Sequence, residues 1–244
     1  MTGQKNPAGT LAVNESESLA SKGLAGLGLL FVLPWPSLGA YFALHASPGA
    51  FGQGLFAFSK IWMLLFPWAW VKFIEKKKTG WPAFRREGMG VGLATGLAIF
   101  AVIWAAFLLF DSKIDRVELR QKIGDAGLDS VSVYIFAACY WTLINSLIEE
   151  YLWRWFVPTQ GLVVFGRRGA IFAAGVFFAL HHIIAMAAYL ALGLNLLAAL
   201  GVACGGMIWS WIYLRYRNLW AAYLSHILAD LGVFSVGYLL LFKG

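Results

Sequence analysis

The sequence predicts an all-α integral membrane protein, a polytopic helical bundle of about seven or eight transmembrane helices. Of its 244 residues, 60% are hydrophobic and only 13% are charged, and the mean hydropathy is +0.71. A soluble domain usually carries about 25% charged residues to cover its surface. Long apolar runs recur along the chain, and about 20 apolar residues cross the hydrocarbon core of a bilayer as a helix.

Seven apolar runs bounded by charged or turn residues have this length. They lie near residues 23–45, 52–74, 88–110, 131–157, 169–189, 191–214 and 219–242. The sequence AYLALGLN (188–195) barely interrupts the fifth and sixth runs, which leaves room for an eighth short or re-entrant helix. Residues 1–22 are small and polar and lack an apolar signal core, so they predict a flexible tail. Residues 23–242 then form a single transmembrane domain.

Basic residues gather in alternate loops. The basic loops are KFIEKKKTGWPAFRRE (72–87), GRRG (166–169) and RYRN (215–218), and with seven spans they share one side with Lys5 and Lys22. Because basic loops are retained in the cytoplasm, this pattern predicts a cytoplasmic N-terminus and a C-terminus outside. In a bacterium the membrane would be the cytoplasmic membrane. The net charge of +7 is therefore interpreted as a topology signal, and no nucleic-acid partner is expected.

The segment 111–130, DSKIDRVELRQKIGDAGLDS, is expected to form a short helix at the membrane surface. The charges of its acidic and basic residues nearly cancel. Ile114, Val117, Ile123 and Leu128 provide a sparse apolar face, as in helices that lie in the membrane interface. With seven spans, this segment lies on the side opposite the basic loops.

Ionisable residues at membrane depth are concentrated in the C-terminal half. Of the twelve Asp and Glu residues, only Glu149, Glu150 and Asp230 fall well inside predicted spans. Three of the four histidines also lie inside spans, namely His181, His182 and His226. Ionisable groups in the hydrocarbon region are costly unless they are paired or hydrated, so they mark a functional site by default.

The segment LINSLIEEYLWRWFV (143–157) carries two adjacent acids with different predicted roles. Glu150 and Arg154 are four residues apart on one helical face, which predicts an ion pair. Glu149 points about 100° away and has no basic partner in its own helix, so we expect its partner to come from another helix. Lys60, near the start of the second span, is expected instead to extend its ammonium to the membrane interface.

The polar set predicts hydrolysis of a peptide bond inside the membrane. A glutamate and a histidine that share a water can remove its proton and make a nucleophile. A second imidazole with a polar side chain one turn away, such as His226 with Asp230, can stabilise the oxyanion of a tetrahedral intermediate. The sequence contains no HExxH, GxSG or GxGD motif, which would have indicated other classes of intramembrane protease.

Three short motifs, in this order, resemble those of a known family. EEYLWR (149–154) fits EExxxR, FALHH (178–182) or FFALH (177–181) fits FxxxH, and HILAD (226–230) fits HxxxN/D. In an all-helical membrane chain, this order resembles the CAAX-protease and bacteriocin-processing family of intramembrane endopeptidases, which includes the eukaryotic Ras-converting endopeptidase. The resemblance covers about residues 131–242, so the first three spans match only by hydropathy.

The resemblance implies that Glu149 is the general base and that His182 or His181 helps it to activate water. The register of FALHH favours His182, because a leucine lies two residues after Phe178 as in the family pattern. The implied mechanism requires no cofactor. Family members are often called metalloproteases, however, and in that alternative Glu149, His182 and His226 would hold Zn²⁺.

The resemblance also implies that His226 and Asp230 stabilise the oxyanion, and that Glu150 with Arg154 supports the site. Two positions depart from the family pattern. Trp155 stands where glycine is frequent, and Asp230 stands where asparagine is frequent. Because an ionised aspartate opposes an oxyanion, Asp230 is alternatively interpreted as orienting His226 or as an outer partner of a metal ligand.

The function predicted from these residues is that of an intramembrane endopeptidase. Its expected partners are the lipid bilayer and a membrane-associated protein or peptide substrate, such as a prenylated tail, a peptide precursor or a C-terminal sorting anchor. A second hypothesis is a proton-coupled transporter in which Glu149, His182 and Asp230 relay protons. The sequence lacks the inverted repeats typical of that class. A third hypothesis is a non-catalytic family member that acts as an immunity or scaffold protein.

Overall fold

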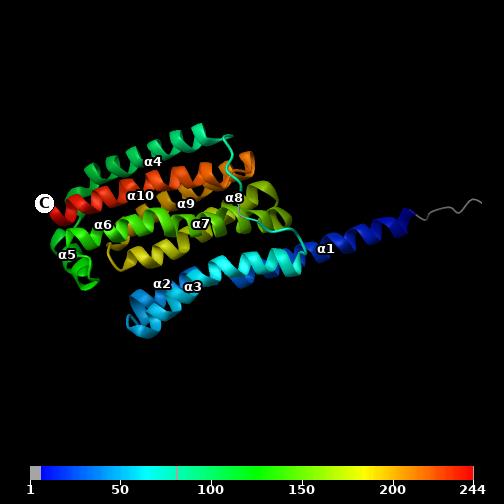
Figure 1. The fold of residues 1–244 in the computed structure, drawn as a ribbon, viewed down its shortest axis with the longest axis horizontal. Helices are drawn as coiled ribbons and strands as arrows, with labels where there is room; N and C mark the ends of the chain where they lie inside the picture. The colour runs from blue at the N-terminus through cyan, green and yellow to red at the C-terminus, as the bar shows by residue number, and fades with distance from the viewer. Residues whose placement is uncertain (1–6, 81, 244) are drawn as a thin grey trace, which may run out of the picture.

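A computed structural model describes residues 7–80 and 82–243, with side-chain environments for Leu19 and from Ser21 onward. The described residues form only helices and their connections (Figure 1), which confirms the predicted all-α class. The elements are α1 (Pro7–Val32), α2 (Pro34–Tyr41), η1 (Phe42–Ala46), α3 (Ala50–Ala69), η2 (Trp70–Ile74), α4 (Met89–Phe110), η3 (Asp111–Lys113), α5 (Arg116–Asp125), α6 (Val131–Cys139), η4 (Tyr140–Asn145), α7 (Ser146–Glu150), η5 (Tyr151–Phe156), α8 (Val157–Ala187), α9 (Leu192–Tyr216) and α10 (Leu219–Phe242).

Six helical segments within the described residues are long and apolar enough to cross a membrane. They are Ser21–Ala46, Ala50–Ile74, Met89–Lys113, Val131–Ala187, Leu192–Tyr216 and Leu219–Phe242. The fourth segment has 57 residues and contains a reversal of chain direction, so it corresponds to the fourth and fifth predicted spans. The protein is therefore a multi-pass integral membrane protein, with approximately the number of spans predicted.

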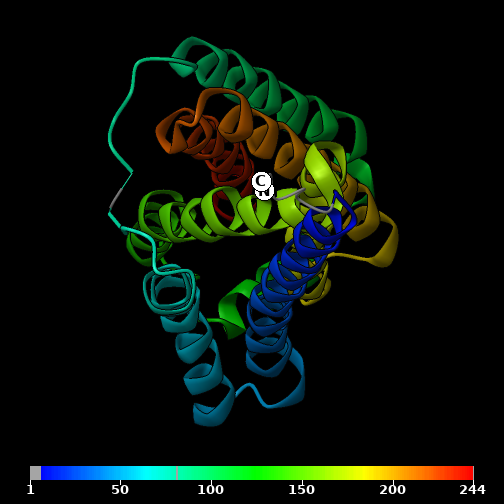
Figure 2. The ribbon, with the colours of Figure 1, turned by 90° about the vertical axis from the view of Figure 1, so that its right-hand side faces the viewer.

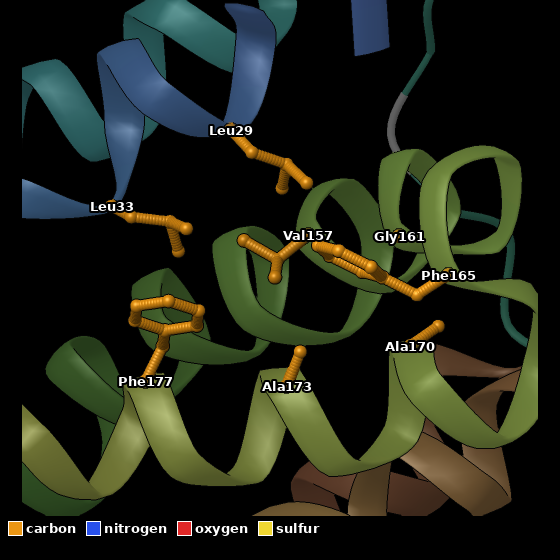
Figure 3. A pocket seen from close by; sticks show the side chains of 8 residues that line it. All are labelled: Leu29, Leu33, Val157, Gly161, Phe165, Ala170, Ala173 and Phe177. Atoms are coloured by element: carbon orange, nitrogen blue, oxygen red, sulfur yellow. The ribbon is translucent and has the colours of Figure 1, made fainter. Parts of the chain in front are cut away.

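The chain reverses direction at Gly166, inside α8. The backbone there (φ 68°, ψ −179°) lies in a region open to glycine but strained for residues with a Cβ atom. The helix before the reversal packs against the helix after it, with Gly161 against Ala170 (Figure 3). Leu29 of α1 and Leu33, between α1 and α2, close a small apolar pocket over this hairpin. The reversal brings the FALHH segment alongside the EEYLWR segment.

The three basic loops lie at one end of the bundle, and the C-terminus lies at the other (Figure 1). Asn218 Nδ2 donates to the backbone carbonyls of Arg85 and Glu87, at 2.8 Å each. Trp220 Nε1 donates to the carbonyl of Pro82 at 3.0 Å. These bonds fasten the loop before α4 to the start of α10. The grouping of the basic loops agrees with the predicted topology, whereas the assignment of this end to the cytoplasm stays a prediction.

The short helix expected within residues 111–130 is present as α5. The side chain of Asp115 caps it by accepting the backbone N–H groups of Val117 and Glu118, at 3.0 Å each. Arg120 Nε donates to the carbonyl of Leu240 at 3.0 Å, which ties α5 to the C-terminal end of α10. The helix therefore lies at the end of the bundle opposite the basic loops (Figure 1).

The structure adds detail in two regions, the N-terminal tail and the connection between α8 and α9. Helix α1 begins at Pro7, so helical backbone covers most of the predicted flexible tail, and residues 1–6 lie outside the described residues. No glycine or proline interrupts residues 10–22, so the helix continues through this polar segment. Between α8 and α9, residues 188–191 form only a turn, and the described residues there contain no eighth helix.

Helix α4 packs closely against α10 through glycine (Figure 2). A Cβ atom at Gly92 would lie 2.1 Å from the carbonyl oxygen of Ala221, and a Cβ atom at Gly96 would lie 2.9 Å from Cα of Ser225. Small residues allow membrane helices to approach in this way. The close approach places Thr95 Oγ1 at 3.0 Å from Ser225 Oγ.

Gly92→Val should destabilise the protein by about 1–3 kcal/mol, because the added side chain must push α4 away from the backbone of α10. Thermal unfolding in detergent measures this effect. Gly90→Val is the matched control, since a Cβ atom at Gly90 meets nothing within 4 Å, and it should change stability by no more than about 0.5 kcal/mol. An equal loss in both variants would contradict the close contact at Gly92.

Candidate active site

Both glutamates lie in α7, a short α-helical turn between the π-helical segments η4 and η5. π-helical turns within α-helices occur frequently at functional sites, because they shift side chains away from the regular spacing. The side chains in question are buried, with Glu149 4% exposed and Glu150 and Arg154 0% exposed. Helix α7 and the following segment η5 therefore hold three ionisable groups inside the protein.

Glu150 connects two helices. Its Oε1 accepts a hydrogen bond from Arg154 Nε at 3.1 Å, and His226 Nδ1 of α10 lies 3.0 Å from the same oxygen. The Arg154 guanidinium also lies over the rings of Phe178 (4.5 Å) and Trp209 (5.1 Å). The predicted ion pair between Glu150 and Arg154 is confirmed. The sequence did not predict that the same carboxylate also holds His226.

Glu149 has partners from three other helical segments, as its isolation within its own helix predicts. Its Oε1 lies 3.4 Å from Lys60 Nζ of α3 and 3.6 Å from His181 Nε2 of α8. Its Oε2 lies 4.0 Å from His226 Nε2 of α10. One carboxylate therefore faces an ammonium and two imidazoles in the interior of the bundle.

The expectation that Lys60 extends to the membrane interface is wrong. Its ammonium points inward to Glu149 and lies over the rings of Phe56 (5.2 Å) and Trp141 (5.6 Å). The physical reason is that a buried carboxylate offers the ammonium an ion pair, so that neither charge is left alone at membrane depth. A sequence signal exists, because Lys60 is the only charged residue between positions 50 and 71.

The two adjacent histidines have different surroundings. His181 stacks on Trp153 (5.5 Å between centroids, 7° between planes), and neither of its ring nitrogens has a hydrogen-bond partner among the described residues. His182 Nδ1 donates to the carbonyl of Phe178 in its own helix at 2.9 Å. The motif register favours His182, whereas the contact with Glu149 favours His181.

His226 and Asp230 lie together as their spacing predicts, with 3.7 Å between Nε2 and Oδ1. Ser146 Oγ donates to the Asp230 carboxylate. The imidazole of His226 stacks on Trp209 (4.2 Å, 18°), whose Nε1 donates to Ser225 Oγ at 2.8 Å. Sequence reasoning missed Ser146 and Trp209. For Ser146 a signal was present, since it lies one helical turn before Glu149.

Zinc-binding residue types converge in the site, but a neighbouring ammonium opposes a zinc ion there. Ligand atoms of Glu149, His181 and His182 lie within 4.8 Å of one another; this set differs from the implied set, which contained His226. Lys60 Nζ lies 3.4 Å from Glu149 Oε1, and an ammonium at that position repels a divalent cation bound to the same carboxylate. The residues as placed therefore do not fit the metal alternative.

Comparison with known protein families gives a match in the C-terminal part of the chain. A family model described as type II CAAX prenyl endopeptidase Rce1-like matches residues 131–232. No curated protein and no solved structure matches the chain. The matched range contains every motif residue from Glu149 to Asp230 and excludes α1 to α4. Residues 131–232 are therefore similar to the Rce1-like family of CAAX prenyl endopeptidases, in agreement with the resemblance of the three motifs.

Proposed function

We propose that this protein is an intramembrane endopeptidase of the CAAX-protease type, which hydrolyses a peptide bond of a membrane-associated substrate. The observation that carries the proposal is the convergence of Glu149 with His181 and His226 inside the family-matched segment. Burying a carboxylate and two imidazoles at membrane depth costs free energy, so such a group of side chains indicates a function. Activation of water for hydrolysis explains all three.

In this proposal Glu149 is the general base and His181, or in the alternative His182, shares the water with it. The distances of 3.6 Å to His181 and 4.0 Å to His226 exceed direct hydrogen bonds, so a water that contacts Glu149 and a histidine would link them. The water oxygen attacks the scissile carbonyl carbon while Glu149 takes a proton from it. Glu149 then returns this proton to the leaving amine as the C–N bond breaks.

His226 stabilises the oxyanion that forms on the scissile carbonyl. In the imidazolium form both ring nitrogens are donors, so Nδ1 donates to Glu150 while Nε2 donates to the oxyanion. Asp230, held by Ser146, orients Nε2 and does not itself contact the oxyanion. Arg154 acts through Glu150, because its ion pair keeps the carboxylate that positions His226 in place.

Cleavage of defined peptides in liposomes tests the proposal. The peptide set contains a prenylated cysteine followed by three residues, the same peptide without the prenyl group, and peptides anchored by a transmembrane helix. Mass spectrometry of the released fragments identifies the bond that is cut. We expect cleavage of at least one membrane-anchored peptide. A protein that cleaves none of them would instead agree with proton transport or with a non-catalytic binding role.

His226→Ala should lower kcat by about 10²–10³-fold, because the oxyanion loses its donor. Initial rates of peptide release, measured with the substrate that the wild-type protein cleaves, check this prediction. His45→Ala is the matched control, since His45 Nε2 contacts the carbonyl of Ile184 at 2.8 Å and takes no part in the proposed chemistry. A His226→Ala protein as fast as the His45→Ala protein would contradict the assigned role.

A further inference from the structure

We propose that Lys60 is a positioning residue of this site: its ammonium holds the Glu149 carboxylate in place and occupies the position beside it that a divalent metal ion would otherwise take. The inference rests on the proposed function and extends it. Lys60 belongs to α3 and therefore lies outside residues 131–232, which the family model matches. The first part of the chain would then contribute directly to the active site.

The Lys60 ammonium is fixed by contacts on several sides. It lies 3.4 Å from Glu149 Oε1, and the two side chains are only 13% and 5% exposed. The aromatic faces of Phe56, one turn earlier in α3, and Trp141 of η4 lie 5.2 Å and 5.6 Å from it. Cations are attracted to such faces, most strongly where water is excluded. The lysine is therefore directed into the site.

Neutralisation of a buried charge alone does not account for this geometry. Glu149 Oε1 lies between Lys60 Nζ and His181 Nε2, while Oε2 faces His226 Nε2. Removing Lys60 would take away the ammonium beside Glu149 Oε1 and free the carboxylate to turn. Arg154 is already paired with the neighbouring carboxylate, because its Nε donates to Glu150. Lys60 thus fixes the orientation in which the Glu149 carboxylate faces the two histidines.

The same ammonium explains why the donor set does not suit a metal ion. Glu149, His181 and His182 present donor atoms within 4.8 Å of one another, and these are residue types that bind zinc. Lys60 Nζ already lies at the carboxylate, so a divalent ion there would meet a positive charge at close range. Replacing the lysine with an uncharged residue should therefore convert the donor set into a metal site.

The kinetic test compares Lys60→Met and Lys60→Arg with the wild-type protein on the same membrane-anchored peptide. A misplaced base lowers the rate of the chemical step, so Lys60→Met should lower kcat by about 10²-fold with little change in KM. Lys60→Arg keeps the positive charge and should recover most of this loss. The control is Lys72→Met, because Lys72 Nζ lies over Trp68 at 4.7 Å. A wild-type kcat for Lys60→Met would overturn the positioning role.

The metal test does not depend on activity. Each purified protein is incubated with zinc, dialysed and analysed for bound metal. Lys60→Met should retain stoichiometric zinc, whereas the wild-type protein and Lys60→Met/Glu149→Gln should not. The double variant lacks both partners of the ion pair, so neither charge is left buried alone, and gel filtration checks its folding. Stoichiometric zinc in the wild-type protein, or none in Lys60→Met, would overturn the inference. If no peptide is cleaved by any protein, the proposed function fails while zinc binding still tests the role of Lys60.

Discussion

Glu149→Gln is expected to reduce kcat for peptide cleavage by about 10²–10⁴-fold while the protein remains folded. The amide has nearly the shape of the carboxylate, but it cannot accept a proton from water. The substitution also leaves the buried Lys60 ammonium without its anionic partner, so some loss of stability is expected. Cleavage under single-turnover conditions in liposomes measures the chemical step, and thermal unfolding in detergent measures stability.

Two variants separate the chemical effect from the effect on stability. Lys60→Met/Glu149→Gln removes both charges and should regain stability without regaining cleavage. Glu118→Gln is the control for loss of a carboxylate, because Glu118 pairs with Lys122 at 2.8 Å on α5 and is 60% exposed. A Glu149→Gln protein with a wild-type rate would remove Glu149 from the mechanism and leave the buried carboxylate with a structural role alone.

Arg154→Met should destabilise the protein by about 3–5 kcal/mol, which is the expected loss when one partner of a buried ion pair is removed. Glu150, which is 0% exposed, would keep only His226 as a partner. The rings of Phe178 and Trp209 would also lose their contact with the guanidinium that lies over both of them. Thermal or denaturant unfolding in detergent measures the loss.

The double variant Glu150→Gln/Arg154→Met tests whether the unpaired Glu150 carboxylate causes this loss of stability. Both buried charges are absent from it, so a substantial part of the lost stability should return. Arg215→Met is the control for the loss of a guanidinium, since Arg215 lies exposed near the end of α9 against Tyr216. If Arg154→Met is as stable as the wild-type protein, the pair does not hold the helix in place, and His226 must be positioned by other contacts.

Much of the architecture followed from local features of the sequence. The lengths of the apolar runs predicted the spans, because a membrane helix satisfies its backbone within one continuous segment. The ion pair between Glu150 and Arg154 was equally local, since four residues make one helical turn. The end of the span predicted at residue 157 was less accurate. Pro158 does not stop the helix there, which continues to the reversal at Gly166.

Only the tertiary structure decided what surrounds Glu149. The sequence by itself determined that this acid is buried and lacks a partner in its own helix. It did not determine that the partner is Lys60, 89 residues away. It also did not determine that His181 contacts the carboxylate, since the motif register favours His182. Such contacts depend on how each helix is rotated about its axis. In a membrane both the lipid-facing and the protein-facing surfaces of a helix are apolar, so hydrophobic periodicity carries little information about that rotation.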